Sequence, residues 1–138
     1  KVSLVSVFGV GQSALVAQTY RLNLIAENLA NAEVAASTPE GAYKGQYPVF
    51  RSVLSEVGDS EAMGVKIDGT VEDQRPARSS YEPGNPLADE DGFVYMSNVN
   101  SVQEMANMMA ASRSYQTNVE VMNTAKDLLM RTLTIGQQ

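Results

Sequence analysis

The chain has 138 residues, of which 43% are hydrophobic, and carries a formal net charge of −6. This length is enough for one or two small domains with a modest core. The lack of Cys and His in the sequence excludes disulfides, thiolate nucleophiles, structural zinc and a catalytic triad built on histidine. The negative charge gives no reason to expect nucleic acid as a partner, and no apolar run approaches the length of a membrane span.

Residues 4–30 have the periodicity of a long amphipathic helix. Their apolar positions recur in alternating steps of four and three, which is the spacing of a coiled-coil seam. This seam consists of Leu4, Phe8, Gly11, Leu15, Gln18, Leu22, Ile25 and Leu29. Gly9 and Gly11 each cost about 1 kcal/mol in a helix interior, so we expect soft first turns. The pattern fades over residues 35–39, and Pro39 predicts the end of the helix.

The same stretch shares some features with a secretory signal peptide. These are Lys1, an apolar run over residues 2–10 and the small residues within 14–17. However, the basic region is a single Lys, and the seam continues through the supposed cleavage site. We therefore interpret the segment as a helix of the working protein.

Residues 37–98 differ in composition from both ends of the chain. They contain all five Pro, seven of the ten Gly and the whole net charge of −6. Short apolar or alternating runs predict strands at 43–53, 65–71 and 93–96, with a loop over 57–64 and irregular structure over 75–86. We interpret this middle part as a small, acidic, β-rich insert that stays solvated.

Residues 101–135 predict a second, longer helix. Ser101 and Glu104 have the spacing of a capping box, and Gly136 stands where a helix C-cap is favoured. A helix of this length spans about 50 Å. One apolar stripe comprises Met105, Met108, Tyr115, Val119, Met122, Leu129 and Leu133, and a second comprises Val102, Met109, Val121, Leu128 and Ile135. Together they are broader than a two-helix seam needs, so we expect several packing partners.

The matching seams predict that the two terminal helices pair in antiparallel fashion. In this pairing we expect Leu22 and Ile25 to face three residues of the second helix, Val119, Met122 and Leu129. The seam positions Gln18 and Lys126 are polar, and we expect them to set the register of the pair.

Candidate sites for chemistry are few. The acidic run 89–91 before Gly92 invites a calcium-loop interpretation, but that register places Leu87 at the first ligand position and Asn98 at the last. A solvated acidic turn fits better. Glu72, Asp73 and Arg75 favour a surface salt-bridge cluster over a carboxylate pair for catalysis. We therefore expect no catalytic, metal-binding or cofactor-binding residue and no enzymatic activity.

Several segments together resemble a known family. They are residues 28–31 (Asn28, Leu29, Ala30 and Asn31), 81–86 with Pro83, Gly84 and Pro86, 88–94, 98–100, and 112–120 with Ser112, Arg113, Tyr115 and Gln116. These segments resemble the bacterial flagellar rod and hook proteins, most closely the proximal rod members. Asn85 and Ser97 depart from the family, which often has His and Pro at these positions.

The periodicity and composition predict an α+β fold with a division into 1–36, 37–98 and 99–138, and the resemblance agrees with this layout. The terminal helices of such proteins form the inner layer of a tube, and the insert lies outside it. The implied function is a structural subunit of the rod, which carries torque from the motor to the hook and forms part of the export channel. The implied partners are copies of the chain, other rod proteins and the membrane-ring or export-gate base of the flagellum. The implied location is the basal body in the periplasmic space, reached through type III export without a cleaved signal peptide.

The side chains expected to mediate assembly lie on both predicted helices. They are Leu15, Leu22, Ile25, Leu29, Met105, Met108, Tyr115, Val119, Met122, Leu128, Leu129 and Leu133. Because the second apolar stripe lacks cover within one chain, we expect both ends of the isolated subunit to order only on assembly.

Two other functions remain open on the sequence. A helical export chaperone or adaptor would share the terminal helices but would hardly need the Pro- and Gly-rich insert. A hydrolase would require the carboxylates of residues 68–91 to converge in a cleft.

Overall fold

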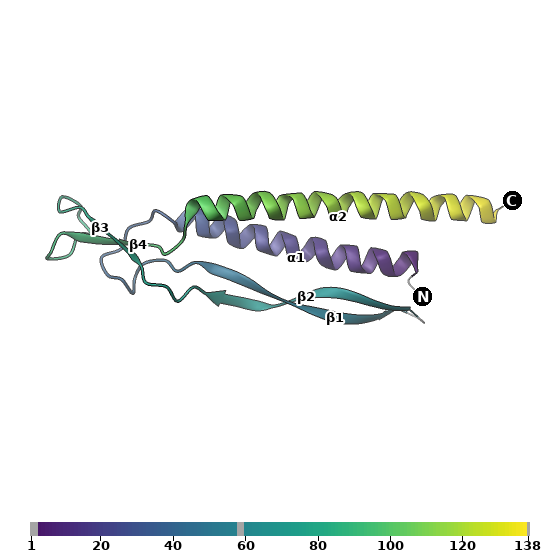
Figure 1. Cartoon of the computed structure of the whole chain (residues 1–138), viewed down its shortest axis with the longest axis horizontal. Coiled ribbons are helices and arrows are strands. Elements are labelled where there is room, and N and C mark those ends of the chain that lie inside the picture. Colours follow the sequence, from purple (N-terminus) through teal and green to yellow (C-terminus); the bar gives the residue numbers. More distant parts are fainter. Residues whose placement is uncertain (1–2, 58–59, 138) are drawn as a thin grey trace. The chain divides into compact units, whose positions relative to one another are not determined.

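A computed structural model describes residues 3–57 and 60–137, and it confirms the α+β class (Figure 1). Two long terminal helices enclose, in sequence, an insert made of two separate two-stranded sheets. The elements are α1 (Leu4–Asn31), β1 (Gln46–Val57), β2 (Ser60–Glu72), β3 (Arg78–Tyr81), β4 (Phe93–Met96) and α2 (Ser101–Gly136).

The bounds of the elements differ from expectation mainly around the insert. α1 ends at Asn31, well before Pro39, and Ala36 beyond it forms a backbone bridge with Tyr95, with N–O distances of 2.7 and 3.0 Å. β2 begins at Ser60, inside the segment expected to be a loop, of which Gly58 and Asp59 lie outside the described residues. β3 occupies part of the stretch expected to be irregular, whereas β4 and the start of α2 lie where predicted.

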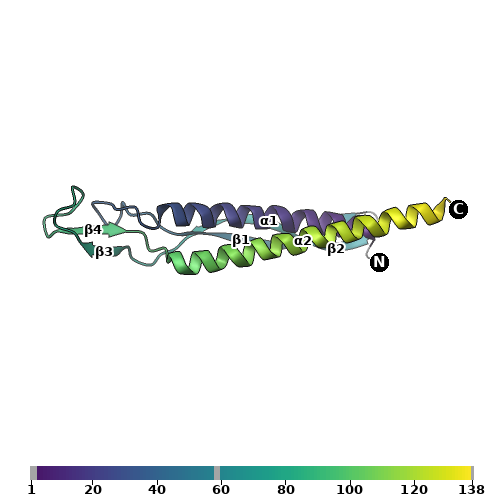
Figure 2. The same cartoon turned by 90° about the horizontal axis from the view of Figure 1, so that it is seen from above.

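The chain divides into two compact units, and parts of both helices belong to each. Unit 1 comprises Lys1–Tyr20, Val49–Gly69 and Ala110–Gln138, and unit 2 comprises Arg21–Pro48 and Thr70–Met109. Within each unit the parts of α1 and α2 run antiparallel (Figure 2). In unit 1, α1 lies between α2 and the β1–β2 pair (Figure 1), and the backbone N–H of Val65 donates to Ser13 Oγ at 3.1 Å.

The register of the helix pair differs from the one predicted. Met122 lies against Gly11, where an added Cβ would come within 2.7 Å of the Met122 Cγ. Gly11 precedes Leu22 by eleven residues, or about 16 Å along a helix. The expected pairing of Leu22 and Ile25 with Val119, Met122 and Leu129 is therefore wrong. The apolar periodicity repeats every seven residues, so it indicated an antiparallel pair without specifying the register.

The β3–β4 sheet is an antiparallel hairpin whose inward face forms part of the core of unit 2. Val94 is fully buried, and Tyr81 pairs with Phe93 at the loop end of the strands. The rings of this pair meet edge to face at a centroid distance of 5.3 Å. Gly92 has a φ of +86°, a conformation that side chains rarely adopt, and so permits the turn into β4.

The fully buried side chains are mostly small or polar. The largest with less than 2% exposure are Glu104, Val94, Val99, Asn28, Ser6 and Ser97. Two of these six are small serines and two are strongly polar, so hydrogen bonding contributes to these interiors alongside apolar packing.

Candidate assembly surfaces and a polar junction

The most prominent surface feature of the chain is the apolar side of α2. All five residues of the second predicted stripe are exposed, with fractions of 77% for Val102, 69% for Met109, 49% for Val121 and Leu128, and 75% for Ile135. Every described residue from 130 to 137 is exposed as well. Large apolar side chains exposed in this number along one helix indicate an interaction surface.

The side of α2 that is covered within the chain is lined by small or polar residues. Glu104, Ala111 and Ala125 are buried at multiples of seven residues, and Asn118 between them is half-buried. This line lies one position away from the predicted stripe, whose member Lys126 is exposed. The expectation that Lys126 is buried and sets the register is therefore wrong. Small or polar residues at seven-residue intervals were the sequence signal that hydrophobicity alone did not reveal.

The side chains expected to mediate assembly fall into two groups. The first group is buried or half-buried within the chain: Ile25, Leu15, Leu22, Leu29, Met108, Val119, Met122 and Leu129. The second group is exposed: Met105, Tyr115, Leu128 and Leu133. Gln18, on α1, is half-buried, and its buried Oε1 accepts no hydrogen bond from a described residue. The exposed group therefore offers the larger surface to another chain without rearrangement.

The segments of the family resemblance do not form one site. Asn28 is buried in unit 2, whereas Ala30 is exposed, and Asn31 donates only to its own helix, at the Glu27 carbonyl. Pro83, Gly84 and Pro86 are exposed in the β3–β4 turn. On α2, Ser112 is half-buried, and Arg113, Tyr115 and Gln116 are exposed in unit 1.

Asn28 is the centre of a buried polar junction between three segments. Its Nδ2 donates to the Gln46 carbonyl at 2.9 Å and to Glu104 Oε2 at 3.3 Å. Its Oδ1 accepts from the Gln46 backbone N–H and from the Tyr43 hydroxyl, both at 2.9 Å. Asn28 is 0% exposed and Glu104 1%. Both oxygens of Glu104 receive amide donors, since Asn107 Nδ2 donates to Oε1 at 3.3 Å.

The phenols of the junction are held as neutral donors. Burial is the main cause that raises the pKa of Tyr43 and of Tyr47, and the carboxylate of Glu104 adds to both shifts. At neutral pH these hydroxyls therefore keep their protons and can donate to the amide and carboxylate oxygens around them.

A second buried amide, Asn98, ties strand ends of the insert together. Its Nδ2 donates to the carbonyls of Asp73 at 3.0 Å and Arg75 at 2.8 Å, and its Oδ1 accepts from the Gly45 N–H at 2.9 Å. Arg78 donates to the carbonyls of Ala32 and Ser97 at 3.0 and 2.8 Å. These bonds join the end of α1, the insert and the approach to α2 within unit 2.

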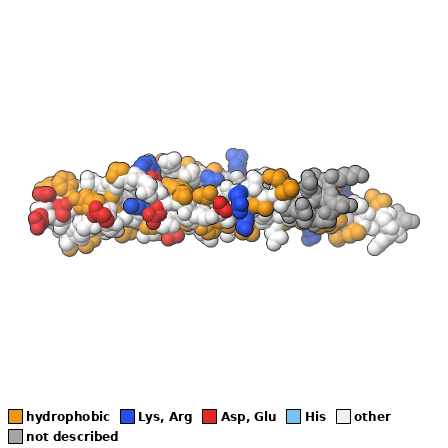
Figure 3. Space-filling model, turned by 90° about the horizontal axis from the view of Figure 1, so that it is seen from below, with side chains coloured by type: hydrophobic (Ala, Val, Ile, Leu, Met, Phe, Trp, Pro, Cys, Tyr) orange, Lys and Arg blue, Asp and Glu red, His pale blue; other side chains and the backbone are white. Residues whose placement is uncertain are grey.

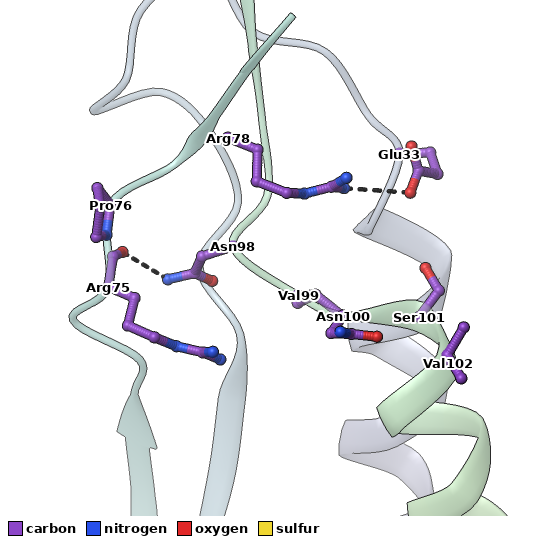
Figure 4. Close-up of a pocket in the computed structure, with 9 residues that line it drawn as sticks. All are labelled: Glu33, Arg75, Pro76, Arg78, Asn98, Val99, Asn100, Ser101 and Val102. Atoms are coloured by element: carbon purple, nitrogen blue, oxygen red, sulfur yellow. Dashed lines mark hydrogen bonds and ion pairs between the residues drawn. The ribbon is translucent and has the colours of Figure 1, made fainter.

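A surface hollow of about 530 Å³ lies beside this second amide (Figure 4). Arg75, Arg78 and Val102 are among the residues that line it. Each arginine already has a carboxylate partner, because Arg78 pairs with Glu33 at 3.1 Å and Arg75 donates from Nε to Asp73 Oδ2 at 2.8 Å. The hydrogen bonds to Arg75 lower the pKa of Asp73. The hollow therefore offers a surface recess without an unpaired cation.

The carboxylates of residues 68–91 bind different partners and so do not support the hydrolase alternative. Asp68 pairs with Arg51, Asp73 with Arg75, and Asp89 accepts from the Phe93 N–H and the Tyr95 hydroxyl, both at 2.8 Å. Asp89 is thus an organiser of its turn and not merely a solvated acid.

Among residues 3–57 and 60–137, no group of three or more carboxylates could hold a metal ion. None of the helices in this described part is long and apolar enough to cross a membrane.

Charge is distributed unevenly between the two units. Unit 2 contains ten acidic and four basic residues, whereas unit 1 contains six of each. Figure 3 shows acidic side chains gathered at the end where β3 and β4 lie. Unit 1, which holds most of the exposed apolar part of α2, is therefore electrically neutral and can approach another chain without net repulsion.

Comparisons with known proteins give full-length relatives. The family described as flagellar basal body rod FlgEFG protein C-terminal matches residues 90–135. The chain is 47% identical over 135 residues to flagellar basal-body rod protein FlgC of Salmonella typhimurium, an alignment that covers 98% of this chain and 99% of that protein. FlgC of Escherichia coli O157:H7 is 46% identical, and that of Buchnera aphidicola subsp. Baizongia pistaciae is 34% identical, each with the same coverage.

Proposed function

The chain belongs to the FlgC family of flagellar basal-body rod proteins and is a structural subunit of the basal-body rod, and we propose that it polymerises through the apolar surface of α2. The observation that carries this proposal is the exposure of Val102, Met109, Val121, Leu128 and Ile135 along one helix. Fully burying one such side chain contributes about 1.5–3 kcal/mol. Covering five of them by neighbouring subunits would supply a large part of the free energy of assembly.

The partners in this scheme are copies of the chain and other rod proteins. A surface that must meet several kinds of neighbour benefits from adaptable side chains, and Met105, Met109 and Met130 are all exposed on α2. The neutral charge of unit 1 favours such contacts. The base of the rod would in addition contact the membrane ring or the export gate.

We propose that the subunit divides functionally into an inner part and an outer part. Residues 1–36 and 99–138 would form the wall of the export channel, and the acidic insert 37–98 would face outward. The assembled rod would transmit torque from the motor to the hook. Exposed apolar residues on the inner part and acidic ones on the insert support this arrangement.

The proposed location is the periplasmic part of the basal body, reached through the flagellar export apparatus. The N-terminal segment is part of the folded subunit, because α1 begins at Leu4. Ser6 in this segment is only 1% exposed and so contributes to the packing of unit 1.

A pair of charge substitutions on α2 tests the assembly surface. Val121→Asp should prevent rod formation and swimming in a strain that lacks its own copy, because the carboxylate would have to be desolvated in the contact. Asn123→Asp is the matched control, since it adds the same charge at an exposed polar position two residues away. Rods are counted in purified basal bodies, and subunit levels are measured in parallel. Normal rods with Val121→Asp would refute the proposed surface.

A further inference from the structure

The α1–α2 pair needs a feature that distinguishes its register from registers shifted by seven residues. On α1, Leu15, Leu22 and Leu29 are seven residues apart, and on α2 the half-buried Met108, Met122 and Leu129 are separated by fourteen and seven residues. Sliding one helix by seven residues brings like side chains onto like positions. Apolar burial alone therefore discriminates poorly between these arrangements.

Asn28 is a buried polar side chain of the pair that does not repeat, since residues 14 and 21 of the same series are Ala and Arg. A slide by seven residues in one direction would place it against Ala111, and in the other direction it would lie opposite residue 97, before α2 begins. In either case the buried carboxylate of Glu104 loses its Asn28 donor. A buried polar group deprived of its partner is strongly disfavoured, so the mismatch selects against the shifted registers.

We propose that Asn28 is a positioning residue that sets the register of α1 against α2 through its bond to Glu104. The same side chain accepts from the Gln46 N–H and donates to the Gln46 carbonyl, so it also fixes where β1 departs. Register decides which apolar residues of α2 are covered and which stay exposed. That consequence for assembly rests on the function proposed above, whereas the register itself does not.

Distance measurements between spin labels test the proposal in the full-length chain. The chain has no Cys, so labels can be attached at cysteines introduced for Asn23 and Gln103, both exposed in unit 2. A slide by seven residues changes the axial separation of the labels by about 10 Å. We expect one distance population in the otherwise unchanged chain. Asn28→Leu should add a second population, displaced by about that amount.

Asn31→Leu is the matched control, because Asn31 belongs to the same four-residue segment but its side chain donates to the Glu27 carbonyl of its own helix. It should keep the single population. Glu104→Leu should broaden the register as Asn28→Leu does, and Glu104→Gln, which retains an acceptor, should restore the single population. A single unshifted population in Asn28→Leu and Glu104→Leu, with only a lower unfolding midpoint, would overturn the proposal.

Two further outcomes are informative. Loss of every defined distance in both leucine variants would also overturn the proposal. It would mean that the bond between Asn28 and Glu104 is needed for the two helices to pack at all and does not choose between registers. A shifted register in Asn28→Leu together with normal rods would instead leave this inference intact and refute the assembly surface proposed for α2.

Discussion

At the scale of single residues, the insert is organised by side chains that each bind several backbone groups. Asp89 accepts from the N–H groups of Asp91 and Phe93 and from the Tyr95 hydroxyl. Asn98 links three backbone positions in the same way. The role of Asn98 could not be predicted from its sequence neighbourhood, because its partners are 23 to 53 residues away and only the folded chain brings them together. The partners of Asp89 lie within six residues, so its role is that of a local turn organiser.

Asp89 makes the stability of the β3–β4 turn depend on pH. The bond from the Phe93 N–H, followed by that from Tyr95, lowers the pKa of Asp89 in the folded protein. A lowered pKa means that the unfolded chain binds the proton more readily, so the stabilisation is present above the unfolded value of about 3.9 and is lost as the pH falls through the folded value. Asp89→Asn should therefore lower the thermal midpoint at pH 7, and its difference from the unchanged chain should shrink in acid.

Asp91→Asn is the control for this experiment, since it removes an equal charge two residues away. Midpoints are measured by circular dichroism between pH 7 and pH 2. A difference between the Asp89→Asn and Asp91→Asn midpoints that stays constant over this range would contradict the assignment.

At the scale of elements, the sequence was sufficient for the existence and type of both helices and for the insert between them. Long three-and-four periodicities and the contrast in Pro and Gly content are strong signals, and β4 and α2 begin where they were predicted. The covered line of α2 was misplaced because Glu104, Ala111 and Ala125 carry little hydrophobic signal. Small residues permit close approach of helices, which is a property of packing that a hydrophobicity pattern does not contain.

Ala111 provides a test of this close approach. It is 0% exposed, so Ala111→Leu forces extra atoms into a filled interior of unit 1 and should reduce the free energy of unfolding by about 1–3 kcal/mol. Ala110 is exposed, and Ala110→Leu should change that free energy by less than about 0.5 kcal/mol. Urea unfolding of both variants gives the comparison. Equal unfolding free energies for the two variants would show that Ala111 does not lie in a tight contact.

At the scale of the whole molecule, a polar interior in unit 2 coexists with uncovered apolar residues in unit 1. Unit 2 contains the Asn28 junction, the Asn98 links and all of the net charge, whereas unit 1 has the exposed second half of α2. The expectation that both ends of the isolated subunit order only on assembly stays a prediction. Ile25 is 4% exposed and Glu104 1%, so part of each helix is packed within the chain.

This difference predicts graded order along α2 in the isolated subunit. A helix of exposed residues is marginal in water, because ordering each residue costs about 1–2 kcal/mol and few tertiary contacts compensate. Residues 130–137 are all exposed, whereas residues 101–109 include the buried Glu104. Amide hydrogens of a dilute, verified monomer should therefore exchange quickly over 130–137 and slowly around 104. On assembly, neighbours would cover the terminal turns, and exchange there should slow by at least about tenfold, the equivalent of 1.4 kcal/mol. Slow exchange over 130–137 in the monomer would mean that these turns are stable without a partner, and coupling of their folding to assembly would be excluded.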